Sequence, residues 1–287
     1  MPGSLNVWDT PRNRKEFLPF PSRKIDGFSE HPVKKDGFYY IEKFNIRKGK
    51  TMTCNLKWLC ALLPLCLTAA EPVFHVPLDG SANVLGGKGE TVASGTITGS
   101  GTYQDGAVGK ALDVNWKGPD QMTIAEFRKL PAMNCKAGTV AFWFKPEWRE
   151  GQANWIISSR DEAWKGFRFY LLRNEKGDLD LSVCIPKQVQ VYRKSPLKAG
   201  EWAHIAFVWN AKSSEVHFYI NGKGIGSRTV PGAHTEPENP IKILLFLGTE
   251  GKQAQTKTGC GLYDDIKIFD QALSPGEIAG LAVRNSK

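Results

Sequence analysis

Pairs of acidic residues are the clearest place to look for catalysis, because cleaving a glycosidic bond takes two carboxyl groups about 5–9 Å apart. On one β-strand this spacing requires Asp or Glu at positions i and i+2 or i and i+4, since alternate side chains share a face. Three pairs come closest: Asp178 with Asp180, Asp264 with Asp265, and Glu236 with Glu238. The first pair has the i and i+2 spacing, but it flanks a predicted hairpin after Gly177 and has no third acidic partner. The second pair is adjacent and points to opposite faces, and the third lies in a proline-rich stretch. We therefore expect a protein that is not an enzyme.

Tryptophan side chains offer a different chemistry, since the flat ring of an exposed indole packs against the C–H face of a sugar. Trp116, Trp148 and Trp164 lie at predicted loops or strand ends, each next to charged residues. We predict these three as candidate ligand-binding residues, with packing in the core or rim as the alternative. Four others lie inside apolar strands and are assigned to the core: Trp143, Trp155, Trp202 and Trp209.

The positive charge of the chain lies mainly near its N-terminus. The formal net charge is +9, and residues 1–70 contain 12 basic and 6 acidic residues. The rest of the chain is nearly balanced, whereas binding to nucleic-acid phosphates needs clustered excess charge. We therefore expect no nucleic-acid partner. No apolar run reaches the ~18 residues of a membrane helix, so we expect no membrane span in the mature chain.

Residues 52–70 have the pattern of a secretory signal peptide. Lys57 precedes the apolar stretch Trp58–Leu67, and the small residues of Thr68-Ala69-Ala70 offer a cleavage site. The mature chain, 71–287, would then be secreted, periplasmic or at the cell surface. Residues 1–51 contain a basic tract just before Met52, which is typical of a bacterial ribosome-binding region translated by mistake. We interpret 1–51 as a wrongly assigned gene start or a disordered extension.

Three cysteines remain in the mature chain, namely Cys135, Cys184 and Cys260. An oxidising compartment permits disulfides, but an odd number allows one bridge at most. The spacing does not decide whether any two are bridged.

The mature chain has the pattern of an all-β sandwich. Short apolar or alternating runs recur between Gly, Asn, Asp and Lys turns, and residues 80–106 are expected to form long rim loops. The predicted strands are Phe74–Leu78, Ala111–Val114, Met122–Phe127, Thr139–Phe144, Trp155–Ser159, Phe167–Leu172, Leu179–Ile185, Trp202–Trp209, Glu215–Ile220, Ile241–Leu247 and Leu262–Phe269. One short helix is predicted near the end, where Ser274, Pro275 and Glu277 form a capping box with proline at the first helical position.

Four segments, in order along the chain, resemble the laminin-G-like jelly rolls of the concanavalin A-like lectin/glucanase class. They are His75–Ser81 (HVPLDGS), Gly106–Asp113 (GAVGKALD), Gly200–Ala206 (GEWAHIA) with Phe218–Lys223 (FYINGK), and Gly261–Phe269 (GLYDDIKIF) with Ala272–Ile278. The resemblance covers residues 73–283. It implies a two-sheet antiparallel jelly-roll sandwich with a short C-terminal helix.

The resemblance also implies what the domain could bind. Domains of this type often hold a structural Ca²⁺ at the rim, and Asp79 and Asp264 are the implied metal ligands, with carbonyl groups of the loop Gly106–Lys110 completing the site. The Glu-x-Asp-x-Glu strand of the hydrolases in this class is absent. We therefore expect a secreted, non-catalytic module that binds glycans or another extracellular ligand, such as a protein. A glycoside hydrolase or polysaccharide lyase on the same fold, and a structural or adhesion module of the cell envelope, are the alternatives.

Overall fold

The computed structural model describes residues 28–35, 38–45, 70–115, 123–148, 151–162, 166–237, 240–248, 250 and 260–283. The chain divides into two units, Met1–Leu65 and Cys66–Lys287. In the first unit, the strands β1 (Phe28–Lys35) and β2 (Phe38–Asn45) pair antiparallel. We had predicted no element there, although the aromatic residues of β2 have a high propensity for strands.

The described part of the second unit is built from short strands and one helix. Its elements are β3 (Phe74–Val76), β4 (Asn83–Leu85), β5 (Thr91–Ser94), β6 (Thr96–Thr98), β7 (Tyr103–Asp105), β8 (Lys110–Val114), β9 (Ile124–Phe127), β10 (Ala132–Met133), β11 (Ala137–Pro146), β12 (Asn154–Asp161), β13 (Arg168–Arg173), β14 (Asp178–Cys184), β15 (Gln188–Lys194), β16 (Ala203–Asn210), β17 (Glu215–Ile220), β18 (Lys223–Thr229), β19 (Ile241–Leu247), β20 (Gly261–Phe269) and α2 (Pro275–Leu281).

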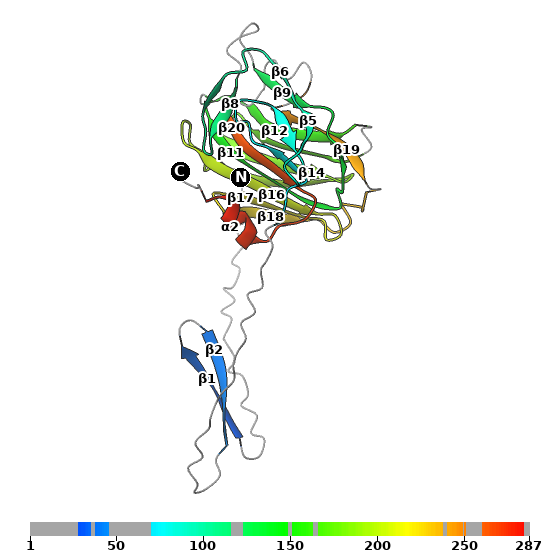
Figure 1. The fold of residues 1–287 in the computed structure, drawn as a ribbon. Coiled ribbons are helices and arrows are strands. Elements are labelled where there is room, and N and C mark those ends of the chain that lie inside the picture. The colour runs from blue at the N-terminus through cyan, green and yellow to red at the C-terminus, as the bar shows by residue number, and fades with distance from the viewer. Residues whose placement is uncertain are drawn as a thin grey trace, which may run out of the picture. The chain divides into compact units, whose positions relative to one another are not determined.

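These strands form two antiparallel sheets that pack face to face (Figure 1). Sheet A has the order β15-β14-β13-β12-β19-β9-β6, with β10 also paired to β19. Sheet B has the order β18-β17-β16-β11-β20-β3-β4-β5, with β8 paired to β20 and β7 paired to β8. The predicted all-β, two-sheet sandwich with a short C-terminal helix is therefore confirmed.

The core lies between the two sheets and is rich in aromatic rings. Phe142 of β11, Phe169 of β13 and Phe207 of β16 are all buried on the inward faces. Trp209 is fully buried, and its indole N–H donates a hydrogen bond to the carbonyl of Cys135 at 3.0 Å. The indole lies so close to Gly138 that a Cβ atom at this position would collide with it. Phe142, Phe169 and Phe207 alternate with outward residues along their strands, as period-2 patterning requires.

Helix α2 begins as its sequence predicts. Ser274 accepts a hydrogen bond from the backbone N–H of Glu277 through its hydroxyl, and the Glu277 side chain accepts from the Ser274 backbone N–H. The helix lies beside β17 and β18 (Figure 1), and buried Ile278 packs with Ala206 and Phe269 on the outer face of sheet B. No helix in the described part of the chain is long and apolar enough to cross a bilayer.

Every predicted strand is present, and most of their bounds move by one or two residues. The expectation of long loops over residues 80–106 is wrong, because β4, β5, β6 and β7 lie there. Each of these strands has only three or four residues, too few for hydrophobic alternation to stand out from the surrounding Gly and Thr. Two longer strands, β15 and β18, were also not predicted.

Candidate functional site

The two acidic residues implied as metal ligands meet at one loop. Asp79 follows β3, Asp264 lies in β20, and the loop Gly106–Lys110 joins β7 to β8. The backbone N–H of Lys110 donates to Asp79 Oδ1 at 2.6 Å, and the N–H of Val108 donates to Asp264 Oδ2 at 2.7 Å. The structure therefore brings the two carboxylates to the same five residues of chain.

Glycines allow this close approach. A Cβ atom at Gly106 would collide with Asp264 Oδ2, and one at Gly109 would collide with Asp79 Oδ1. Gly109 also has a φ of 73°, in the left-handed region that favours glycine. The loop thus needs glycine at both positions to lie against the carboxylates.

The carboxyl group of Asp264 is in an unusual environment. Its side chain is fully buried, and its Oδ1 atom has no hydrogen-bond partner. The pKa of Asp264 is raised to about 7, mainly because the group is buried, while the N–H groups of Val108 and Ala107 oppose the shift and the charges of Asp265 and Asp79 add to it. A buried carboxylate oxygen without a partner is an acceptor that a cation or a donor could satisfy.

The other titratable side chains do not form a metal cluster. Within the described residues, no group of three or more His, Cys, Asp or Glu side chains is arranged to hold a metal. Asp265 points away from Asp264 and binds His75 Nε2 at 2.7 Å. His204 lies edge-on to Trp143 at 5.2 Å, and His234 Nε2 lies 3.1 Å from the carbonyl of Val183. The three cysteines are buried at separate places in the sandwich.

The structure describes one of the three candidate tryptophans, and that ring is buried. Trp148 is 8% exposed, its ring centroid lies 5.6 Å from that of Phe144, and the guanidinium carbon of Arg173 lies 4.9 Å from the Trp148 centroid. Trp148 therefore offers no exposed ring to a sugar. Trp116 and Trp164 lie outside the described residues, and their assignment stays a prediction.

A cavity lies at the rim of the sandwich. Glu162 and Gly166 both line this cavity, which has a volume of about 670 Å³. Phe167, Pro186 and Lys242 are among the other lining residues.

An aromatic surface that we did not predict lies on the outer face of sheet A. We had assigned Trp155 to the core, but it is only half-buried and its ring contacts that of Tyr170, with centroids 5.0 Å apart and planes at 57°. Tyr192 of β15, 47% exposed, lies on the same face. In the register of the sheet, Tyr192 is opposite Asp180, Asp180 is opposite Leu172, and Leu172 is opposite Trp155. One row of residues therefore crosses four strands with an aromatic ring at each end.

A groove of about 410 Å³ lies along this row. Its lining residues are Ala153, Asn154, Trp155, Leu172, Arg173, Asn174, Glu175, Lys176 and Tyr192. The groove thus combines two aromatic side chains with several polar ones, which is the usual composition of a small-molecule site.

Hydrogen bonds hold the Tyr192 ring in place at the edge of this groove. The Tyr192 hydroxyl donates to Asp178 Oδ2 at 2.6 Å and accepts from Asn174 Nδ2 at 2.7 Å. Asn174 in turn accepts the backbone N–H of Asp178 at 2.9 Å. The Asp178 carboxylate therefore positions an aromatic ring. The neighbouring Asp180 accepts from Gln190 Nε2 at 2.6 Å.

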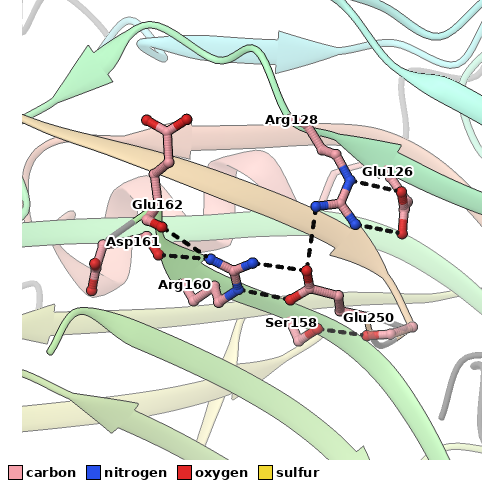
Figure 2. A network of polar contacts seen from close by, with 8 residues as sticks. Glu126, Arg128, Ser158, Arg160, Asp161, Glu162 and Glu250 are labelled. Carbon is pink, nitrogen blue, oxygen red and sulfur yellow. Dashed lines mark hydrogen bonds and ion pairs between the residues drawn. The ribbon is translucent and has the colours of Figure 1, made fainter. Parts of the chain in front are cut away.

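Further along β12, the outer face carries a network of opposite charges (Figure 2). Glu250 accepts hydrogen bonds from Arg160 Nε at 2.7 Å and Nη2 at 2.8 Å, and from Arg128 Nη1 at 3.3 Å. Arg128 also pairs with Glu126 at 2.9 Å. Both arginines have carboxylate partners, and their hydrogen bonds fix Glu250 against the sheet. This part of the face therefore carries paired charges, whereas the groove combines aromatic and polar side chains.

Comparison with known proteins agrees with the fold. Residues 118–279, more than half of the chain, match the "Concanavalin A-like lectin/glucanases superfamily". Neuronal pentraxin-1 of Rattus norvegicus is 28% identical over 169 residues, which are 56% of this chain and 36% of that protein. The chain thus spans about a third of the length of this curated relative.

Two solved structures have a similar sandwich. Domain 4 of AbnA, a GH43 extracellular arabinanase from Geobacillus stearothermophilus solved in complex with arabinotriose, has a TM-score of 0.54 and 21% identity, covering 75% of this chain and 100% of that one. The binding domain of Paraclostridial Mosquitocidal Protein 1 has a TM-score of 0.54 and 17% identity, covering 74% and 52%. The likeness in structure, together with the match over residues 118–279, means that this chain belongs to the concanavalin A-like lectin/glucanases superfamily.

Proposed function

We propose that the chain is a carbohydrate-binding module without catalytic activity of its own, and that its sugar lies in the groove between Trp155 and Tyr192. The observation that carries this proposal is the row of residues with an exposed or half-exposed ring at each end. Strands lie about 4.8 Å apart, so three steps place the two backbones roughly 14 Å apart. That span leaves room for a sugar ring between the side chains.

The chemistry of the groove supports this assignment. A sugar has apolar C–H faces that pack on aromatic rings and hydroxyl groups that need polar partners. The groove supplies the rings of Trp155 and Tyr192 and the polar side chains of Asn174 and Glu175. Domain 4 of the arabinanase, which shares the fold, is in complex with arabinotriose. The pattern of residues 52–70 further supports a secreted, periplasmic or cell-surface location.

Binding to polysaccharides tests the proposal directly. We expect the chain beginning at Glu71 to be retarded in affinity gels containing one or more soluble polysaccharides, and to release no reducing sugar from them. Trp155→Ala and Tyr192→Ala should each weaken binding tenfold or more, as truncation of a hot-spot ring does. Arg168→Ala, on the same face at the other end of β13 and outside the groove, is the matched control and should bind normally. Normal binding by both aromatic variants would contradict the groove assignment, and release of reducing sugar would favour an enzyme.

We further propose that Asp79 and Asp264 bind a structural Ca²⁺. The partnerless Asp264 Oδ1 and the loop held against both carboxylates fit a hard cation with oxygen ligands. Two carboxylates supply only part of the 6–8 oxygens that Ca²⁺ takes, so backbone carbonyls and water must supply the rest. The bound ion would neutralise the two negative charges and fix the loop.

Thermal unfolding tests the calcium proposal. Ca²⁺ in excess should raise the Tm by mass action, and the double variant Asp79→Ala with Asp264→Ala should lose this increase. The control Glu201→Ala removes an exposed carboxylate elsewhere and should keep it. An equal Tm with Ca²⁺ and with a chelator would reject the proposal.

A further inference from the structure

Two polar atoms beside the groove are buried without a hydrogen-bond partner. They are Asp180 Oδ1 and Ser182 Oγ. The two residues are i and i+2 on β14, so their side chains share the outer face of sheet A. Buried polar atoms nearly always have a partner, and an exception often marks the place of a water or a ligand.

Asp180 lies beside the groove and is not itself one of its lining residues. It occupies the place between Tyr192 and Leu172 in the row, and both of these line the groove. Its Oδ2 atom accepts a hydrogen bond from Gln190, which leaves Oδ1 as an unused acceptor. Burial raises the pKa of Asp180, and the hydrogen bond from Gln190 only partly offsets this shift.

The charges around the groove select against an anionic ligand. Glu175 lines it, and Asp178 and Asp180 lie beside it on β14. Arg173 is also a lining residue, but its guanidinium donates to the carbonyl of Gln152 at 2.7 Å and lies over the Trp148 ring. Lys176 is therefore the cation that remains at the groove among its described lining residues. A carboxylate or sulfate on a sugar would face three protein carboxylates and one lysine.

Resting on the proposed function, we propose that Asp180 determines specificity in the groove. Its carboxylate accepts hydrogen bonds from neighbouring hydroxyl groups of a neutral sugar, and the acidic surroundings exclude sugars that carry a carboxylate or a sulfate. Gln190 holds the carboxylate in the free protein and gives up its place when sugar hydroxyls arrive. Ser182, next to Asp180 on the same face, is a second hydroxyl that can share this set of hydrogen bonds.

The test compares neutral and anionic polysaccharides on the intact chain from Glu71. The probes are an arabinan, a xylan, a mixed-linkage β-glucan and a mannan, with polygalacturonate and a sulfated galactan as the anionic pair. We expect binding to at least one neutral polymer and none to the anionic pair. Asp180→Asn keeps the shape but removes the charge and one acceptor, and it should weaken neutral binding about tenfold or more, since a hydrogen bond to a charged group is lost. Asp180→Glu keeps the charge and should retain more binding than Asp180→Asn.

Controls separate this inference from the proposed function and from misfolding. Glu201→Gln changes an exposed carboxylate elsewhere and should bind as the unchanged protein does, and each variant is first checked for an unaltered circular-dichroism spectrum and Tm. If Asp180→Asn is unfolded, Ser182→Ala and Gln190→Ala are used in its place, with weaker binding expected for the first and equal or tighter binding for the second. Binding only to the anionic polymers, or equal binding by Asp180→Asn, overturns this inference and leaves the carbohydrate-binding function standing. Failure to bind any of the six overturns both.

Discussion

Asp79 and Asp264 hold opposite parts of one short loop, although 184 residues separate them in the chain. Asp79 accepts the N–H of Lys110 and Asp264 accepts the N–H of Val108. The two carboxylates therefore lie close enough for the charge of Asp79 to raise the pKa of Asp264. This arrangement should make the stability of the domain depend on pH.

Asp264 should destabilise the fold as the pH rises. Its pKa is about 7 in the folded chain, against about 3.9 when unfolded. The folded state therefore binds the extra proton between these values, and the stabilisation present below pH ~4 is lost as the pH rises through ~7. The shift corresponds to an effect of the order of 4 kcal/mol. Urea unfolding of the His204→Phe variant between pH 4 and 8, with a chelator present, should show this decline without the opposing effect of the histidine, and adding Asp264→Asn should remove it.

Calcium should reverse that decline, since it binds the ionised carboxylate. With excess Ca²⁺, the free energy of unfolding at pH 8 should rise more than at pH 5. An equal gain at both pH values would show that the ion acts somewhere other than Asp264.

His204 should make the stability of the fold change with pH in the opposite direction. Burial is the main reason that its pKa is lowered to about 4, with Lys267 adding to the shift and Asp265 opposing it. The unfolded chain, with a histidine pKa near 6.5, binds the proton more readily, so stability falls as the pH drops from ~6.5 to ~4. His204→Phe should remove this loss, because a phenyl ring can keep the contact with Trp143.

Between pH 4 and 6.5, the effects of Asp264 and His204 on the free energy of unfolding have opposite signs. Unfolding of the unchanged chain should therefore depend weakly on pH in this range, whereas each single variant shows the slope of the remaining group. Parallel curves for the two variants would contradict both assignments.

Trp148→Ala should behave as a core substitution. The ring is buried against Phe144 and under Arg173, so its removal should cost about 3–5 kcal/mol of the free energy of unfolding. Polysaccharide binding, measured well below the Tm of the variant, should persist. Trp155→Ala should show the reverse pattern, with weak binding and a smaller loss of stability. Denaturant unfolding and affinity gels on the same samples measure both quantities.

The sequence was sufficient to predict the two-sheet sandwich, because side chains in most strands alternate between inward and outward positions. The sequence did not predict on which face Trp155 lies. The register shifts between Trp155 and Ile157, and Ile156 and Ile157 both enter the core. A bulge of this kind changes which face a residue occupies, so alternation counted along β12 places Trp155 wrongly.

Tyr192 was missed for a different reason. Its strand, β15, alternates Val189 and Val191 on the inside with Gln188, Gln190 and Tyr192 on the outside. This period-2 signal was present in the sequence and would have identified the strand. The position of Trp148, in contrast, depends on its contact with Arg173, which is 25 residues away in β13 of sheet A. No local pattern contains that information.

Strand β20 lies in the interior of sheet B and pairs with β11, β3 and β8, although it is the last of the described strands to be made. During synthesis at about 5–20 residues per second, β11 leaves the ribosome roughly 6–25 s before β20. For that time Phe142 and Phe144 have no neighbour on one side of their strand. Sheet B therefore stays open on that side of β11 until β20 has been made, and a chain truncated before β20 should expose this apolar edge to aggregation.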